Sequence, residues 1–96
     1  MAQGTMTKIH DLTWETVKTG DTSGTIASPD GFKKELLLQI RNTNGGTQFG
    51  SAVFPNVGMP SALVVPYNNT TMIFNRSGST LTYTPVSGYV VNAYVR

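Results

Sequence analysis

The stretch KKELLLQIRNTNGGTQFGSAVF, residues 33–54, decides the fold class of this chain. In its run ELLLQI, every second side chain falls on the same apolar side of an extended chain. Asn44 and Gly45 follow, and both residue types adopt the positive φ that a tight hairpin turn requires. We therefore predict a β-hairpin in which residues 33–41 pair with residues 47–54.

Short runs rich in β-branched and aromatic residues recur along the chain, separated by Gly, Pro, Asn and Ser. A spacing of roughly ten residues between such runs is typical of a β-sandwich or barrel. We predict an all-β, antiparallel β-sandwich of jelly-roll type with about eight short strands. The expected strands are residues 12–18, 24–28, 33–41, 47–54, 61–66, 70–76, 79–84 and 88–95.

Alternation within these strands also predicts the core. The expected inward-facing residues are Met72 with Phe74, Leu81 with Tyr83, and Tyr89 with Val91, Ala93 and Val95. The last strand carries Val90 and Tyr94 on its other face, so it lies in the middle of a sheet or is covered by another element. Together with Leu37 and Ile73, these second-face residues form either the seam of a homo-oligomer or a set of separate exposed apolar side chains.

The length of 96 residues predicts one sandwich domain, residues 12–96, after a flexible N-terminal segment, residues 1–11. Pro55, Pro60 and Pro66 mark strand boundaries or sheet edges, because proline cannot donate into a β-ladder. No apolar run approaches the roughly 20 residues that a membrane helix needs, so we expect no membrane insertion.

The charge of the chain argues against nucleic-acid binding. Seven basic and five acidic residues give a net charge of only +2, although the computed pI is about 9.2. A protein that neutralises about 6 to 10 phosphates would need nearly all of these scattered basic residues on one face. Charged residues make up 12% of the chain, about half the usual fraction. A surface of Thr, Ser, Asn and Gly instead suggests contact with protein or sugar.

The groups that catalysis needs are scarce. The chain has no cysteine and one histidine, His10, which falls in the expected flexible segment. This argues against a Ser-His-Asp triad or a histidine zinc site, and no spacing joins the five acidic residues into an acid–base pair. Asp21 and Asp30 adjoin glycines in turn-rich segments, which favours a role in turns over calcium binding. We predict a protein that is not an enzyme and that carries no cofactor or metal.

One group of residues is a candidate ligand site. Tyr67, Asn68 and Asn69 follow Pro66 and join an aromatic ring to two amides. This combination can stack on a sugar ring and pair with its hydroxyl groups. The alternative interpretation is an ordinary turn.

The order of the motifs resembles a known family. The chain has an early strand with tryptophan (LTWETVKTG), then IASPDGFKKELLLQI, a loop with FPNVGMP, and a last strand GYVVNAYVR. Over residues 12–96 this is similar to the small β-sandwich domains of tailed-phage virion proteins, especially those at the tips of tail fibres and receptor-binding proteins.

The resemblance implies a non-enzymatic virion protein, made in the cytoplasm of the host bacterium and commonly trimeric. Such a protein either binds host surface polysaccharide as an adhesion module, or binds only other virion subunits in capsid decoration or tail assembly. The resemblance transfers no particular sugar-contacting residue, because the loops of these domains vary. The expected partners are copies of this chain, other virion proteins and a host glycan.

Overall fold

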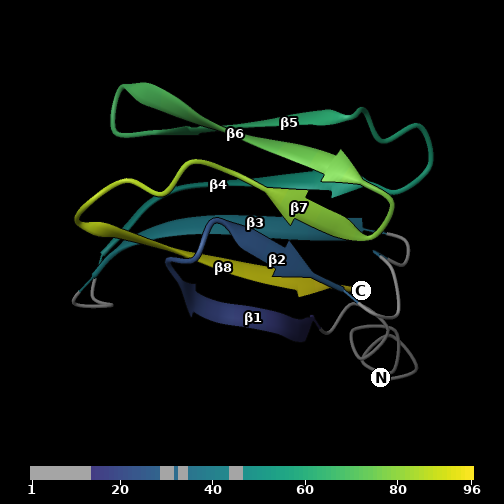
Figure 1. Cartoon of the computed structure of the whole chain (residues 1–96), viewed down its shortest axis with the longest axis horizontal. Coiled ribbons are helices and arrows are strands. Elements are labelled where there is room, and N and C mark those ends of the chain that lie inside the picture. The colour runs from purple at the N-terminus through teal and green to yellow at the C-terminus, as the bar shows by residue number, and fades with distance from the viewer. Residues whose placement is uncertain (1–13, 29–31, 33–34, 44–46) are drawn as a thin grey trace, which may run out of the picture.

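The computed structural model describes residues 14–28, 32, 35–43 and 47–96 of the chain. These residues contain no helix and form two antiparallel four-stranded sheets that pack face to face (Figure 1). The strands are β1 (Glu15–Asp21), β2 (Thr25–Ala27), β3 (Glu35–Asn42), β4 (Gln48–Pro55), β5 (Ala62–Tyr67), β6 (Thr70–Ser77), β7 (Thr80–Thr82) and β8 (Tyr89–Val95). The predicted all-β sandwich of about eight short strands is confirmed.

The opening hairpin forms as the alternation indicates. β3 pairs with β4, and Leu36 lies opposite Phe54 at one end of this ladder. Differences from the predicted ranges lie at strand ends. β1 continues to Asp21 because its ladder with β8 runs through two register shifts. β7 ends at Thr82 rather than at residue 84, because Tyr83 donates its backbone N–H to the carbonyl of Gly24 instead.

The strand order is β1-β8-β3-β4 in one sheet, here called sheet A, and β2-β7-β6-β5 in the other, called sheet B. The pairs β1–β8 and β2–β7 join strands far apart in the sequence, as in a jelly roll. The remaining strands form two local hairpins, β3–β4 and β5–β6. β8 lies between β1 and β3, so the predicted place of this strand in the middle of a sheet is confirmed.

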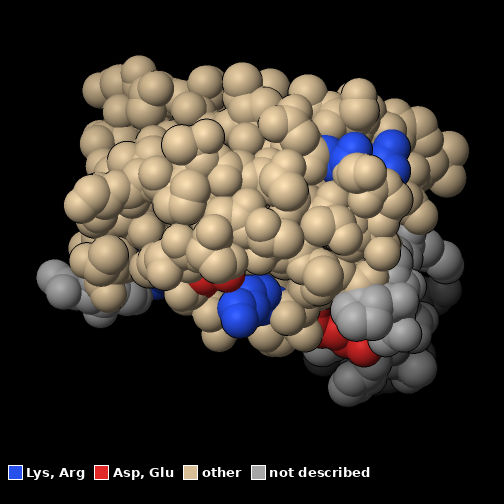
Figure 2. Space-filling model, in the orientation of Figure 1, with Lys and Arg blue, Asp and Glu red and all other residues tan. Residues whose placement is uncertain are grey.

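The outer face of sheet B is almost uncharged. Figure 2 shows this side of the molecule, with charged groups only at its right end and lower margin. Val64 of β5 and Ile73 of β6 lie opposite each other and are 47% and 49% exposed. Thr71 and Asn75 flank Ile73 on the same face of β6 and are also exposed. This face of sheet B therefore presents uncharged side chains to solvent along β5 and β6.

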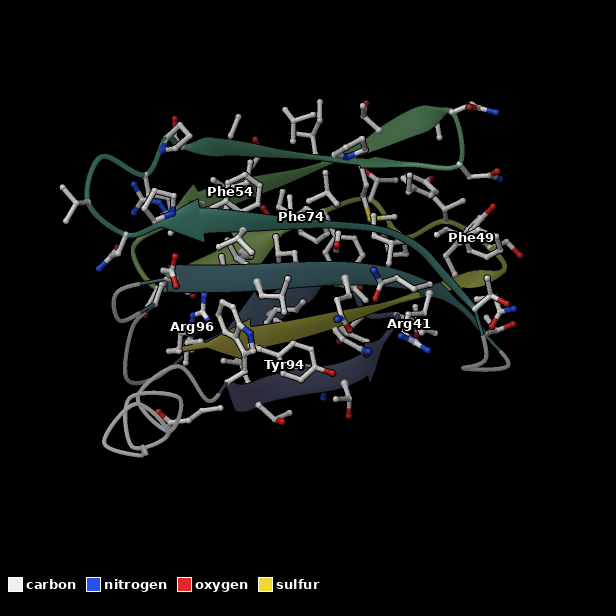
Figure 3. All side chains as sticks on the ribbon, turned by 180° about the vertical axis from the view of Figure 1, so that it is seen from behind. Arg41, Phe49, Phe54, Phe74, Tyr94 and Arg96 are labelled. Carbon is white, nitrogen blue, oxygen red and sulfur yellow. The ribbon has the colours of Figure 1, made fainter. Side chains whose placement is uncertain are left out.

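The core lies between the two sheets, and Phe74 is fully buried near its centre (Figure 3). The predicted inward-facing residues are buried, except that Tyr89 is only half-buried at the end of β8. Other buried apolar side chains are Ile26, Phe32, Leu36, Leu38, Ile40, Met59, Leu63, Val65 and Tyr67. Burial on this scale supplies most of the free energy that holds a small sandwich together.

The two sheets approach most closely where β4 lies over β5. A Cβ atom built on Gly50 of β4 would lie 2.0 Å from the carbonyl oxygen of Pro66 and 2.7 Å from Cβ of Tyr67. Only glycine fits this contact. β5 is an edge strand of sheet B, so the predicted assignment of Pro66 to a sheet edge is confirmed.

The last residue is held at the opposite end of the sandwich. Arg96 Nε lies 2.6 Å from Glu35 Oε1, and the Arg96 guanidinium carbon lies 4.0 Å from the centroid of the Trp14 ring. Arg96 and Glu35 also exchange backbone hydrogen bonds of 3.0 and 3.2 Å. The segment 1–11 with His10, the Asp30 turn and the turn at Asn44 and Gly45 lie outside the described residues.

Candidate functional site

Three aromatic rings from three strands meet at one end of the sandwich. Phe49 belongs to β4, Tyr67 ends β5 and Tyr89 begins β8. Asn68 and Asn69 form the turn that joins β5 to β6 beside them. We call these five residues the aromatic corner.

The rings of the aromatic corner pack edge to face. The centroid of Tyr89 lies 5.1 Å from that of Tyr67 and 5.3 Å from that of Phe49, with interplanar angles of 77° and 76°. Such T-shaped pairs contribute roughly 0.5–1.5 kcal/mol beyond the area that they bury. Asn68 Nδ2 donates to the Tyr89 hydroxyl over 2.9 Å, so the turn is joined to the central ring.

The conformation of the turn suits its sequence. Asn68 and Asn69 have φ of 43° and 64°. Two-residue turns with positive φ at both positions match the twist of a hairpin, and asparagine tolerates this conformation better than most residues. The turn therefore holds two exposed asparagines at a fixed place beside the rings.

Tyr67 is not the stacking platform that we predict from the sequence. It is only 7% exposed, because β5 continues through Pro66 and turns Tyr67 inward with Val65. Its ring is covered by Tyr89 instead of facing solvent. The predicted site residues lie together, but the accessible aromatic surface is that of Phe49, which is 36% exposed, and of the half-buried Tyr89.

Sequence reasoning missed Phe49 and Tyr89 as members of this site. Tyr89 is expected in the core by alternation, and nothing in the spacing brings Phe49 near the turn at Asn68. The two rings meet because β3 pairs with both β4 and β8, which places both of those strands in sheet A. A helpful signal is Gly50, which lets β4 approach β5 directly beside Phe49.

A second polar group lies inside the sandwich. Asp21 and Tyr83 are 4% and 8% exposed, and the Tyr83 hydroxyl donates to the Asp21 carboxylate. Ser23 Oγ donates to the other carboxylate oxygen over 2.8 Å. The pair links the end of β1 in sheet A to the residue that follows β7 in sheet B. Asp21 therefore acts in a turn, as predicted, and also joins the two layers.

Burial raises the pKa of Tyr83 well above its ordinary value, and the hydrogen bond to Asp21 and the charge of Asp21 raise it further. A raised folded-state pKa stabilises the fold fully below the unfolded value of 10.0 and less as the pH rises above it. We expect the free energy of unfolding to fall by up to about 1.4 kcal/mol per pH unit above roughly pH 10.

The variant Tyr83→Phe removes this hydroxyl and leaves Asp21 without its buried donor. We expect a loss of about 1–3 kcal/mol at neutral pH and a smaller decline in alkali. Urea unfolding at roughly pH 8 and pH 11 measures both effects. Tyr94→Phe, which removes a hydroxyl from the outer face of sheet A, is the control. Equal alkaline declines in Tyr83→Phe and the wild type would contradict this prediction.

The described part of the chain was compared with the requirements of a metal site and of a membrane-spanning helix. Among these residues, no three His, Cys, Asp or Glu side chains come close enough together to hold a metal ion. Asp21 and Tyr83 satisfy each other and are closed off from solvent. A search of the same residues for a helix with the length and apolar character of a membrane span found none.

Comparison with protein-family models, with curated protein sequences and with solved structures finds no match to this chain. The fold class therefore rests on the geometry of the two sheets. The likeness to tailed-phage domains rests on the motifs of the sequence alone.

Proposed function

We propose that this protein is a non-enzymatic adhesion module of a tailed-phage virion, and that the aromatic corner binds a host surface polysaccharide. The observation that carries this proposal is the partly exposed Phe49 ring, which lies at one end of the sandwich beside Tyr89 and two exposed amides (Figure 3). The sequence motifs supply the virion context.

The chemistry of the corner favours a neutral sugar. The apolar face of a pyranose ring can pack on Phe49 and the rim of Tyr89, while Asn68 and Asn69 offer amide groups to its hydroxyls. None of the five residues is charged. Strand ends and ring contacts hold the groups in place, which lowers the entropy cost of binding.

An array of bacterial surface polysaccharides, followed by titration of the best ligand, tests this proposal. We expect Phe49→Ala to weaken binding at least tenfold, or about 1.4 kcal/mol, because it removes the exposed ring. Val57→Ala is the matched control, since Val57 is 91% exposed and follows the far end of β4. Tyr67→Ala would also weaken binding, by removing the support of Tyr89. No saturable binding to any glycan, or equal binding by Phe49→Ala, would overturn the proposal.

A second candidate function is capsid decoration or tail assembly, in which the chain binds only other virion subunits. It is favoured by a row of apolar side chains on the outer face of sheet A, where Leu37 lies between Val53 and Tyr94. Val53 is 46% exposed, and the other two are half-buried. We propose that the chain forms a homotrimer and that this row is the seam between its copies. A decoration protein would bind expanded capsids and give no signal on the glycan array.

A further inference from the structure

A groove runs beside β6 on the outer side of sheet B. Its volume is about 620 Å³. The side chains at its walls include Thr71, Ile73, Asn75, Thr82, Thr84 and Val86, and none of the lining residues is charged. It is separate from the aromatic corner, with which it shares no residue.

The hydrogen bonding of β6 determines what its backbone presents to this groove. The backbone N–H of Arg76 donates to the carbonyl oxygen of Ser61, the residue before β5, over 2.7 Å. In an antiparallel pair, hydrogen-bonded and non-hydrogen-bonded residues alternate. Every second residue back from Arg76 therefore bonds to β5, whereas the backbone groups of Thr71, Ile73 and Asn75 point away from β5.

β7 pairs with only part of this edge. Asn75 lies opposite Thr82, where β7 ends. Beyond it, the chain diverges from β6 on its way to β8 (Figure 1). The backbone N–H of Tyr83 donates to the carbonyl of Gly24, on the side away from β6. Pro85 has no N–H to donate. Within the described residues, no backbone hydrogen bond joins Thr71 or Ile73 to residues 83–86.

We propose that this groove binds an extended, uncharged polypeptide segment, which adds as a strand to the edge of β6 at Thr71 and Ile73. Two N–H and two C=O groups spaced about 7 Å apart along a strand match the backbone of another strand. The uncharged lining favours Thr-, Val- and Ser-rich segments over charged ones. Only two residues take part in the ladder, so the groove contributes modest affinity and a fixed register.

Amide hydrogen exchange in the protein alone tests the premise. We expect the amides of Thr71 and Ile73 to exchange at least tenfold faster than those of Met72 and Phe74, which bond to β5. Equal protection of all four amides would show that the edge is already closed and would overturn the proposal.

A synthetic peptide, acetyl-STVTVTS-amide, tests the ligand. At about 1 mM we expect it to shift the amide resonances of Thr71 and Ile73 and to slow their exchange at least threefold. A peptide with alternate backbone nitrogens methylated is the matched control, because it keeps the side chains but loses the donors. No change at Thr71 and Ile73, or the same change with the methylated peptide, would overturn the proposal.

Variants of β6 separate backbone pairing from side-chain contact. Thr71→Pro removes an N–H that faces the groove and spares the bonds to β5, so we expect it to fold and to bind the peptide at least threefold more weakly. Thr71→Val keeps that N–H and should bind as the wild type does. A glycan that shifts the amide resonance of Tyr89 but not that of Ile73 would support the proposed function at the aromatic corner. Peptide binding at the groove is measured separately, at Thr71 and Ile73.

Discussion

Gly50→Ala lowers the free energy of unfolding by about 3 kcal/mol or more, or prevents folding. The added methyl group would lie 2.0 Å from the Pro66 carbonyl oxygen, which belongs to backbone that cannot rotate aside as a side chain can. Relief requires β4 and β5 to separate, and this exposes the core between them. Urea unfolding followed by tryptophan fluorescence measures the loss.

Gly78→Ala is the matched control, because it strains the backbone without creating a clash, whereas Gly50 does not have a positive φ and its substitution creates a clash alone. Gly78 has a φ of 60° in the β6–β7 turn, and no atom lies within 4 Å of the position that an alanine Cβ would take. Alanine there therefore costs only about 1–2 kcal/mol of backbone strain. A loss at Gly50 no larger than that at Gly78 would mean that the two sheets do not approach closely at this edge. Because the aromatic corner adjoins Gly50, any folded Gly50→Ala protein should also lose glycan binding.

Phe74→Ala has the second large effect, a loss of about 3–5 kcal/mol. The Phe74 ring is fully buried between the sheets, and its centroid lies 4.9 Å from that of the Tyr83 ring. Truncation therefore leaves a cavity that the strands cannot close. Thermal unfolding by circular dichroism measures the change, provided that the transition is reversible.

Ile73→Ala gives the matched comparison, because Ile73 is the neighbour of Phe74 on the same strand and points to the other face. It is 49% exposed, and we expect its truncation to cost less than about 1 kcal/mol. Similar losses at the two positions would contradict the two-layer arrangement of the sandwich.

The strands could be predicted because alternation in β3 and β8 follows directly from burial of one face. Leu36, Leu38 and Ile40 are fully buried, as the period-two pattern requires. The pairing of β1 with β8 is not encoded in any local pattern, since these strands lie at opposite ends of the described chain. Alternation states which face a side chain occupies, but not which strand lies beside it.

The candidate site was predictable only in part for the same reason. The sequence predicts that the strand ends at Pro66, which would place Tyr67 in a turn. An edge strand accepts proline, however, and the alternation of buried and exposed side chains continues from Val65 past Pro66 to Tyr67. Tyr67 is therefore inward-facing. Phe49 and Tyr89 come together through strand order, and the Asp21–Tyr83 bond spans 62 residues. Contacts of that kind depend on the complete topology.

β1 and β8 are neighbours in sheet A, and this determines where a linker fused to either strand leaves the molecule. Glu15 lies opposite Val95 in the ladder, and Figure 3 shows Arg96 at one end of the sandwich and Phe49 toward the other. A linker joined before Glu15 or after Val95 would therefore leave the sandwich at the end far from Phe49. A bead or sensor chip attached there would leave Phe49 at the free end of the molecule (Figure 3).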